Sequence, residues 1–160
     1  MKWPFARATR EPGWLVVSLR PTQISFVHGQ YATGGTSLVD RCGTRALEAA
    51  DSGVERLAKE LGFDRYQCST LLAPGDYQML LVDAPNVPHA ELKTAIRWRI
   101  KDLLDYRVDD ATVDVLEVPR NPAGGERGHS MYAVTARNDV IQACIGRFEA
   151  AHIPLIRAEA

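Results

Sequence analysis

The chain has 160 residues, of which 46% are hydrophobic and 24% charged, and its formal net charge is -1 from 19 basic and 20 acidic side chains. These values are typical of one globular domain, or of two small subdomains that share a core, and they argue against a disordered chain. Nucleic-acid binding needs a concentrated basic surface, for which the balanced charge gives no reason. We therefore expect no nucleic-acid partner.

The cysteines indicate a protein of a reducing compartment, and the short apolar runs predict no membrane-spanning segment. The three cysteines, Cys42, Cys68 and Cys144, include no CxxC pair, so neither a disulfide framework nor a zinc site is predicted. The longest apolar runs, such as Met79–Val82, cover only a few residues, whereas a transmembrane helix needs about 20. Residues 1–12 predict an irregular lead that is too short and interrupted for a signal peptide.

Residues 13–84 predict a first module in the order βββαββ. A capping box at Ser52–Glu55 begins its helix, and Gly62 suits the left-handed position that ends it. Pro74-Gly75-Asp76 predicts a turn between the last two strands. The expected strands and the helix cover residues 14–19, 23–27, 37–42, 52–61, 67–72 and 78–83.

Residues 85–151 predict a second module in the order αββα, after a hinge at residues 83–88. The first helix, over residues 89–105, and the last helix each show an apolar stripe at helical spacing. The stripes consist of Leu92, Ile96, Ile100 and Leu103, and of Ile141, Cys144, Ile145 and Phe148. Strands are expected at 112–118 and 130–136, and Asn138 or Asp139 can cap the last helix.

Residues 152–160 predict a final strand, led by Pro154, with no partner in its own neighbourhood. We expect it to return to the first sheet, which makes the second module an insertion within the first. The predicted fold class is α/β, with mixed sheets and helices in each module.

Two segments carry a resemblance to a known family. Residues 87–98 match the pattern Val-Pro-x-x-Glu-Leu-x-x-Ala-Ile-x-Trp, and an acidic stretch follows at 108–110. Residues 132–141 form a strand and a capped helix, with a return at 148–154. These segments resemble the PilM-like proteins of type IV pilus assembly, and most closely the MshI branch of mannose-sensitive haemagglutinin pili. The resemblance covers most of residues 13–160 and is strongest in 76–160.

This resemblance implies a partial actin-like (ribonuclease H-like) fold, with the first module as subdomain 1A and the second as the inserted subdomain 1C. It also implies a non-catalytic scaffold at the cytoplasmic face of the inner membrane. The partners that it implies are the N-terminal tail of a PilN-like membrane protein and the pilus assembly ATPase complex. An exposed strand edge or a groove would accept such an extended tail. Full-length members have two further subdomains that close a nucleotide cleft, so the chain resembles their N-terminal part.

The hairpin between the first two strands departs from the actin-like phosphate loop. In that loop an Asp-x-Gly pattern brings backbone amides to the phosphate; here Ser18 and Arg20 stand at the aspartate and glycine positions, and Pro21 provides no amide. Ser18, Arg20 and Thr22 are therefore the candidate nucleotide-binding residues, but we expect no cofactor, and ATP only in a longer protein. The alternatives are half of an actin-like ATPase, or an unrelated α/β binding module.

Arg97, Trp98, Arg99 and Lys101 form the candidate partner-binding surface, because arginine and tryptophan are enriched at protein interfaces. Two alternatives are that Trp98 packs between helix and sheet, and that it stacks on nucleic acid, which the balanced charge disfavours. The other polar clusters lack metal spacing or a shared cleft, and they comprise His28, His89, His129, His152, Asp109, Asp110 and Asp114. We predict no catalytic residue and no metal site.

Overall fold

The computed structural model describes residues 11–31, 36–47, 52–118 and 130–159. The predicted lead up to residue 10, and His129, therefore lie outside the described residues. In chain order the elements are β1 (Trp14–Arg20), β2 (Gln23–Tyr31), β3 (Ser37–Ala46), α1 (Ser52–Leu61), β4 (Gln67–Leu71), β5 (Tyr77–Asp83), α2 (Leu92–Ile100), β6 (Ala111–Glu117), β7 (Ser130–Arg137), α3 (Asn138–Ala150) and β8 (Leu155–Glu159). One-turn 3-10 helices occupy Phe63–Arg65, His89–Glu91 and Val108–Asp110.

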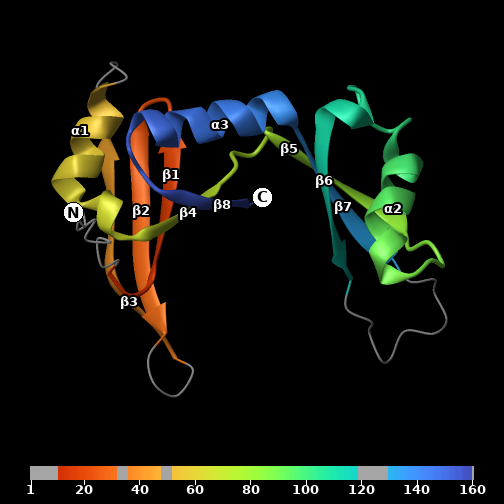
Figure 1. Cartoon of the computed structure of the whole chain (residues 1–160), viewed down its shortest axis with the longest axis horizontal. Helices are drawn as coiled ribbons and strands as arrows, with labels where there is room; N and C mark the ends of the chain where they lie inside the picture. Colours follow the sequence, from red (N-terminus) through yellow and green to blue (C-terminus); the bar gives the residue numbers. More distant parts are fainter. Residues whose placement is uncertain (1–10, 32–35, 48–51, 119–129, 160) are drawn as a thin grey trace, which may run out of the picture. The chain divides into compact units, whose positions relative to one another are not determined.

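The described chain divides into two units (Figure 1). The first contains the residues up to Leu72 together with Cys144–Glu159, and its sheet has the strand order β3-β2-β1-β4-β8. The second contains Ala73–Ala143, and its sheet has the order β5-β7-β6. The helix α3 begins in the second unit and ends in the first.

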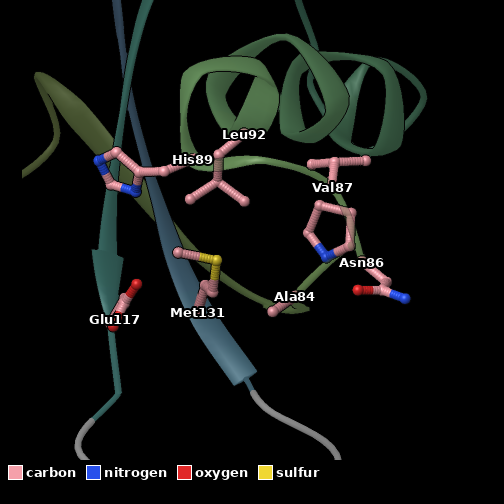
Figure 2. Close-up of a pocket in the computed structure, with 8 residues that line it drawn as sticks. Ala84, Asn86, Val87, His89, Leu92, Glu117 and Met131 are labelled. Atoms are coloured by element: carbon pink, nitrogen blue, oxygen red, sulfur yellow. The ribbon is translucent and has the colours of Figure 1, made fainter.

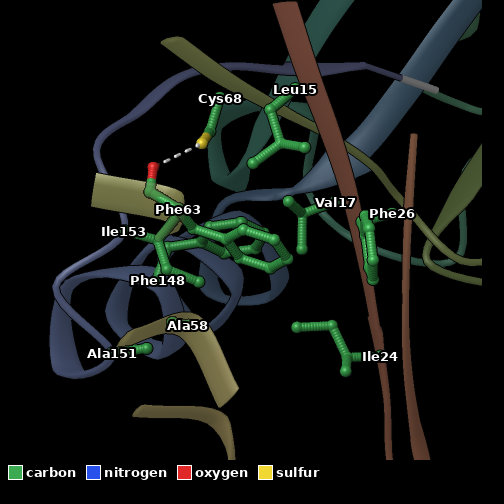
Figure 3. Packing of buried hydrophobic residues seen from close by; sticks show 10 residues of the cluster. All are labelled: Leu15, Val17, Ile24, Phe26, Ala58, Phe63, Cys68, Phe148, Ala151 and Ile153. Atoms are coloured by element: carbon green, nitrogen blue, oxygen red, sulfur yellow. Dashed lines mark hydrogen bonds between the residues drawn. The ribbon is translucent and has the colours of Figure 1, made fainter. Parts of the chain in front are cut away.

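The first unit is a mixed sheet with a core on one face. Strands β1, β2 and β3 pair antiparallel, whereas β4 pairs parallel with both β1 and β8. Alternate residues of β1 and β2 point into the core, as the period of a strand requires. Figure 3 shows how Phe63, Phe148 and Ile153 meet these strand residues, and the whole buried cluster comprises Leu15, Val17, Ile24, Phe26, Ala58, Phe63, Cys68, Phe148, Ala151 and Ile153.

His28, on β2, connects the segment that precedes β1 to the first sheet. The residue is 4% exposed, its Nδ1 lies 2.6 Å from the Asp40 carboxylate, and its Nε2 lies 3.1 Å from the Pro12 carbonyl oxygen. The close approach requires glycine at position 13, where φ is +102° and a Cβ would lie 2.6 Å from both His28 Nε2 and the Gly29 carbonyl oxygen. His28 therefore has a structural role in this unit.

The second unit is a three-stranded antiparallel sheet with α2 on one face. Ile96 and Ile100 of α2 are fully buried, and they pack with Ala111, Val113 and Ala133 of the strands. The Tyr106 hydroxyl lies 2.5 Å from the hydroxyl of the buried Thr135, which satisfies a polar group beside this core.

The division between the modules differs from the predicted one at residue 84. Strand β5 pairs along its whole length with β7, so it belongs to the second sheet. The turn at residues 73–76 redirects the chain, with Gly75 at φ +100° and the Asp76 amide donating to the Ala73 carbonyl oxygen. The second unit also ends at Ala143, earlier than the predicted residue 151. The αββα segment is thus completed by one preceding strand.

The predicted helix over residues 89–105 is shorter in the structure. The helix α2 ends at Ile100, and the Leu103 amide donates to the Ile100 carbonyl oxygen in the turn that follows. Leu103, which was predicted to be buried, is 60% exposed, and Leu104 packs against the core in its place. The burial of Leu104 continues the four-residue spacing of Ile96 and Ile100.

Candidate protein-binding surfaces

The second sheet has an apolar face on the side opposite α2. Directly paired residues in an antiparallel sheet point to the same side, and Leu81, Tyr132 and Leu116 form one such row across β5, β7 and β6. Their side chains are 62%, 37% and 53% exposed, and Met79, two residues before Leu81, is 49% exposed. We call these four residues the apolar sheet face.

Two carboxylates flank the apolar sheet face. Asp83 follows Leu81 by two residues on β5, and Asp114 precedes Leu116 by two residues on β6, so both project to the same side. Lys93 on α2 lies 2.8 Å from Asp114, and its hydrogen bond, followed by that of the Val115 amide, lowers the pKa of this carboxyl. Because Lys93 already pairs with Asp114, the charge that the face offers to a partner comes from Asp83. Exposed apolar area beside this carboxylate suits a partner segment that carries apolar and basic side chains.

The Arg97–Lys101 segment, expected to bind a partner, contains residues of two kinds. Arg97 donates to the carbonyl oxygens of Val108 and Ala111 at 2.7 and 3.0 Å, so its guanidinium connects α2 to the start of β6. Arg99 donates to the Asp83 carbonyl oxygen at 3.0 Å. Both arginines therefore support the fold of the second unit.

Trp98 and Lys101 project away from the core of the second unit. The Trp98 side chain is 69% exposed, and the Lys101 Nζ lies 5.3 Å from the centre of its indole ring. The structure contradicts the alternative that Trp98 packs between helix and sheet, because Trp98 lies two residues from the buried Ile96 and so points to the opposite side of α2.

A pocket of about 320 Å³ opens on the α2 side of the second sheet (Figure 2). Its base is formed by Leu92 and Met131, which are 6% and 1% exposed, and Val87 lines one side. Figure 2 shows His89 and Glu117 on the other side of Met131. This pocket combines an apolar base with polar groups at its rim, as small-molecule and side-chain sites do.

The predicted nucleotide-binding residues lie on and beside the β1–β2 hairpin. Ser18 is half-buried and pairs with Ser25, while Arg20 and Thr22 are exposed. Pro21 and Thr22 form the two-residue turn, and the Thr22 carbonyl oxygen accepts from the Leu47 amide. The structure thus brings Ser18 and Arg20 to one side of β1, beside a turn in which Pro21 provides no amide.

Within the residues that the structure describes, neither a metal site nor a membrane-spanning helix is found. No group of three His, Cys, Asp or Glu side chains is arranged there to hold a metal ion. No helix there has both the length and the apolar character needed to cross a bilayer.

Comparison with solved structures places this architecture among known folds. The chain superposes on PilM from a PilM–PilN type IV pilus biogenesis complex with a TM-score of 0.72 and 13% identity, over 92% of this chain and 47% of that one. It also superposes on the cytoplasmic domain of EpsL, an inner-membrane component of the type II secretion system of Vibrio cholerae. That match has a TM-score of 0.62 and 17% identity, over 91% of this chain and 56% of that domain. The chain has part of an actin-like fold.

The expected likeness to PilM is therefore confirmed at the level of the fold. A more distant match, a Bacteroides thetaiotaomicron protein with an actin-like ATPase fold, has a TM-score of 0.47 and 8% identity, over 99% of this chain and 55% of that one. The chain spans about half the length of the solved structures that it matches. No protein-family model and no curated protein sequence matches it.

The apolar sheet face and the pocket were both missed by the sequence reasoning. For the face a signal was available, because Met79–Val82 is an unbroken apolar run within a strand. An antiparallel strand with one solvated face alternates apolar and polar residues, so an unbroken run indicates that both faces are covered. No comparable signal existed for the pocket, which depends on the register that pairs Glu117 with Met131.

Proposed function

We propose that this chain is a scaffold domain of a type IV pilus assembly system, of the MshI kind, at the cytoplasmic face of the inner membrane. In this role it binds the cytoplasmic tail of a PilN-like membrane protein and connects that protein to the assembly ATPase. The observation that carries the proposal is the likeness to PilM in a PilM–PilN complex, at a TM-score of 0.72 over 92% of the chain. The likeness to a type II secretion component supports a place in this group of membrane machines.

The apolar sheet face supports the proposal because it offers a surface for an extended tail. Leu81 and Leu116 are 62% and 53% exposed, so a partner that covers them fully would remove more than half of the accessible surface of each leucine from water. Full burial of a leucine contributes roughly 1.5–3 kcal/mol. The Asp83 carboxylate would attract a basic residue of the tail and set its orientation, whereas Asp114 is already paired with Lys93. An apolar tail with flanking arginine or lysine residues is the expected partner.

The test measures binding of a synthetic PilN-like tail peptide to the purified chain by fluorescence anisotropy. Leu81→Asp removes one apolar contact and places a third negative charge on the face, so we expect affinity to fall about tenfold or more. Leu103→Asp is the matched control, because Leu103 is a leucine of similar exposure, 60% against 62%, in the turn after α2. Equal affinities of the two variants, or no binding by the parent chain, would contradict the proposal.

We also propose that this chain alone does not hydrolyse ATP. The features in favour are Pro21, which provides no amide, and the long Arg20 side chain at the position where a phosphate loop has glycine. Titration of the chain with a fluorescent ATP analogue in the presence of magnesium tests this, and we expect no saturable binding. A saturable signal that Arg20→Gly strengthens would favour the alternative of half an actin-like ATPase.

A further inference from the structure

We infer that the pocket beside α2 in the second unit is an anchoring site for one arginine side chain of a partner polypeptide. The site is independent of the proposed function, since it lies on the α2 side of the sheet and the apolar sheet face lies on the other. The chemistry of its base and rim identifies the ligand class.

The base of the pocket suits an aliphatic stem. Leu92 and Met131 present buried hydrocarbon and thioether atoms, and Val87 and Pro85 extend this apolar lining. The volume of about 320 Å³ is at the lower end of the range for ligand pockets, which is enough for one long side chain. A methylene chain that packs against these side chains would be removed from contact with water.

The rim suits a planar cation at the end of that stem. Glu117 and Met131 are directly paired residues of β6 and β7, so the Glu117 carboxylate stands on the same side of the sheet as the base of the pocket. No cation among the described residues pairs with Glu117, although neighbouring acidic residues such as Asp114 do have such partners. A carboxylate beside an apolar cavity favours a cation whose dehydration costs little free energy.

Arginine fits this combination better than lysine. The guanidinium group is planar, offers five donors in a fixed fork that matches a carboxylate, and is more weakly hydrated than an ammonium group. His89 faces the same cavity and adds an imidazole ring against which a guanidinium plane can lie (Figure 2).

The three methionines of the chain allow a direct test. In the full chain with 13C-labelled methionine methyl groups, Met131 reports on the pocket, and Met79, on the opposite side of the sheet, is an internal control. The probe is N-acetyl-arginine methylamide. We expect a saturable shift of the Met131 signal at millimolar concentrations, no shift of Met79, and a response to the lysine analogue that is several-fold weaker.

Two variants and a norleucine probe test whether the site recognises the charge of arginine or only its apolar stem. Glu117→Gln should weaken the arginine probe about tenfold, since it removes the charge but keeps the shape. Glu91→Gln, which makes the same charge change outside the pocket lining, should bind as the parent does. The inference is overturned if Met131 does not respond, if Met79 responds equally, if Glu117→Gln binds as tightly as the parent, or if the norleucine analogue binds as well as arginine.

Discussion

Arg97 and Trp98 are neighbours on α2, but the structure gives them opposite roles, and mutation can separate them. The Arg97 guanidinium donates to the carbonyl oxygens of Val108 and Ala111, which bound the 3-10 turn before β6. Arg97→Met removes both hydrogen bonds and keeps most of the aliphatic stem. Trp98→Ala removes a larger side chain that is 69% exposed.

The magnitude follows from these contacts. Hydrogen bonds to a charged group contribute about 1.5–3 kcal/mol each, and solvent screening reduces this because a third of the Arg97 side chain is exposed. We expect Arg97→Met to lower the free energy of unfolding by about 2 kcal/mol, which corresponds to roughly 4–8 °C in Tm for a chain of this length. Trp98→Ala should change it by less than about 0.5 kcal/mol, as for other surface sites.

Urea unfolding followed by far-UV circular dichroism measures both values without relying on the Trp98 fluorophore. Amide hydrogen exchange of β6 then shows whether the loss is local to the second unit, because β6 follows the turn that Arg97 holds. The reasoning is refuted if Arg97→Met unfolds like the parent chain. It is equally refuted if Trp98→Ala costs more than about 2 kcal/mol, since that loss would assign the tryptophan to the core.

Three further predictions concern the first unit. Phe148→Ala should lower its stability by about 3–5 kcal/mol in calorimetry, because Phe148 is fully buried in the core; a loss below about 1 kcal/mol would contradict this packing. Gly13→Ala should reduce Tm, since its Cβ would collide with the Gly29 carbonyl oxygen at a φ of +102°, and an unchanged Tm would show that the chain enters β1 differently. Hydrogen bonds from Gln30 and then His28 lower the pKa of Asp40 in the folded chain, so its stabilisation is present above the unfolded pKa of about 3.9 and is lost as pH falls through the folded value. Asp40→Asn should therefore make the free energy of unfolding fall less steeply with pH below pH 4. The same pH dependence in the variant and the parent chain would argue against this linkage.

The order of the helices and strands could be predicted because each carries a local signal. The capping box and Gly62 predicted α1 at the bounds found, and β1 and β2 were predicted at residues 14–19 and 23–27, within the strands observed. The partner of β5 could not be predicted in the same way. Its residues show an apolar strand, but whether they join β4 or β7 depends on contacts between segments that are distant in sequence.

The candidate site was harder to predict, because the exposure of each side chain near the end of α2 depends on where the helix ends and which way its last residues point. Predicting a helix through residue 105 placed Leu103 on the buried stripe, whereas α2 ends at Ile100 and the turn buries Leu104. Local composition likewise grouped Arg97 with Arg99 and Lys101 as one surface. Their different roles follow from which carbonyl oxygens lie within reach, and that depends on the tertiary structure.

The apolar run of β5 connects the fold to the proposed role. A three-stranded sheet with one helix needs a single apolar face, and Leu80 and Val82 of β5 already provide it toward α2. Leu81 and Met79 face the other side, where threonine would have at least as high a strand propensity. Their exposure adds little to the stability of the second unit and carries a cost in solubility. Such residues are explained if another polypeptide covers the apolar sheet face, and a scaffold that binds an extended tail would provide this cover.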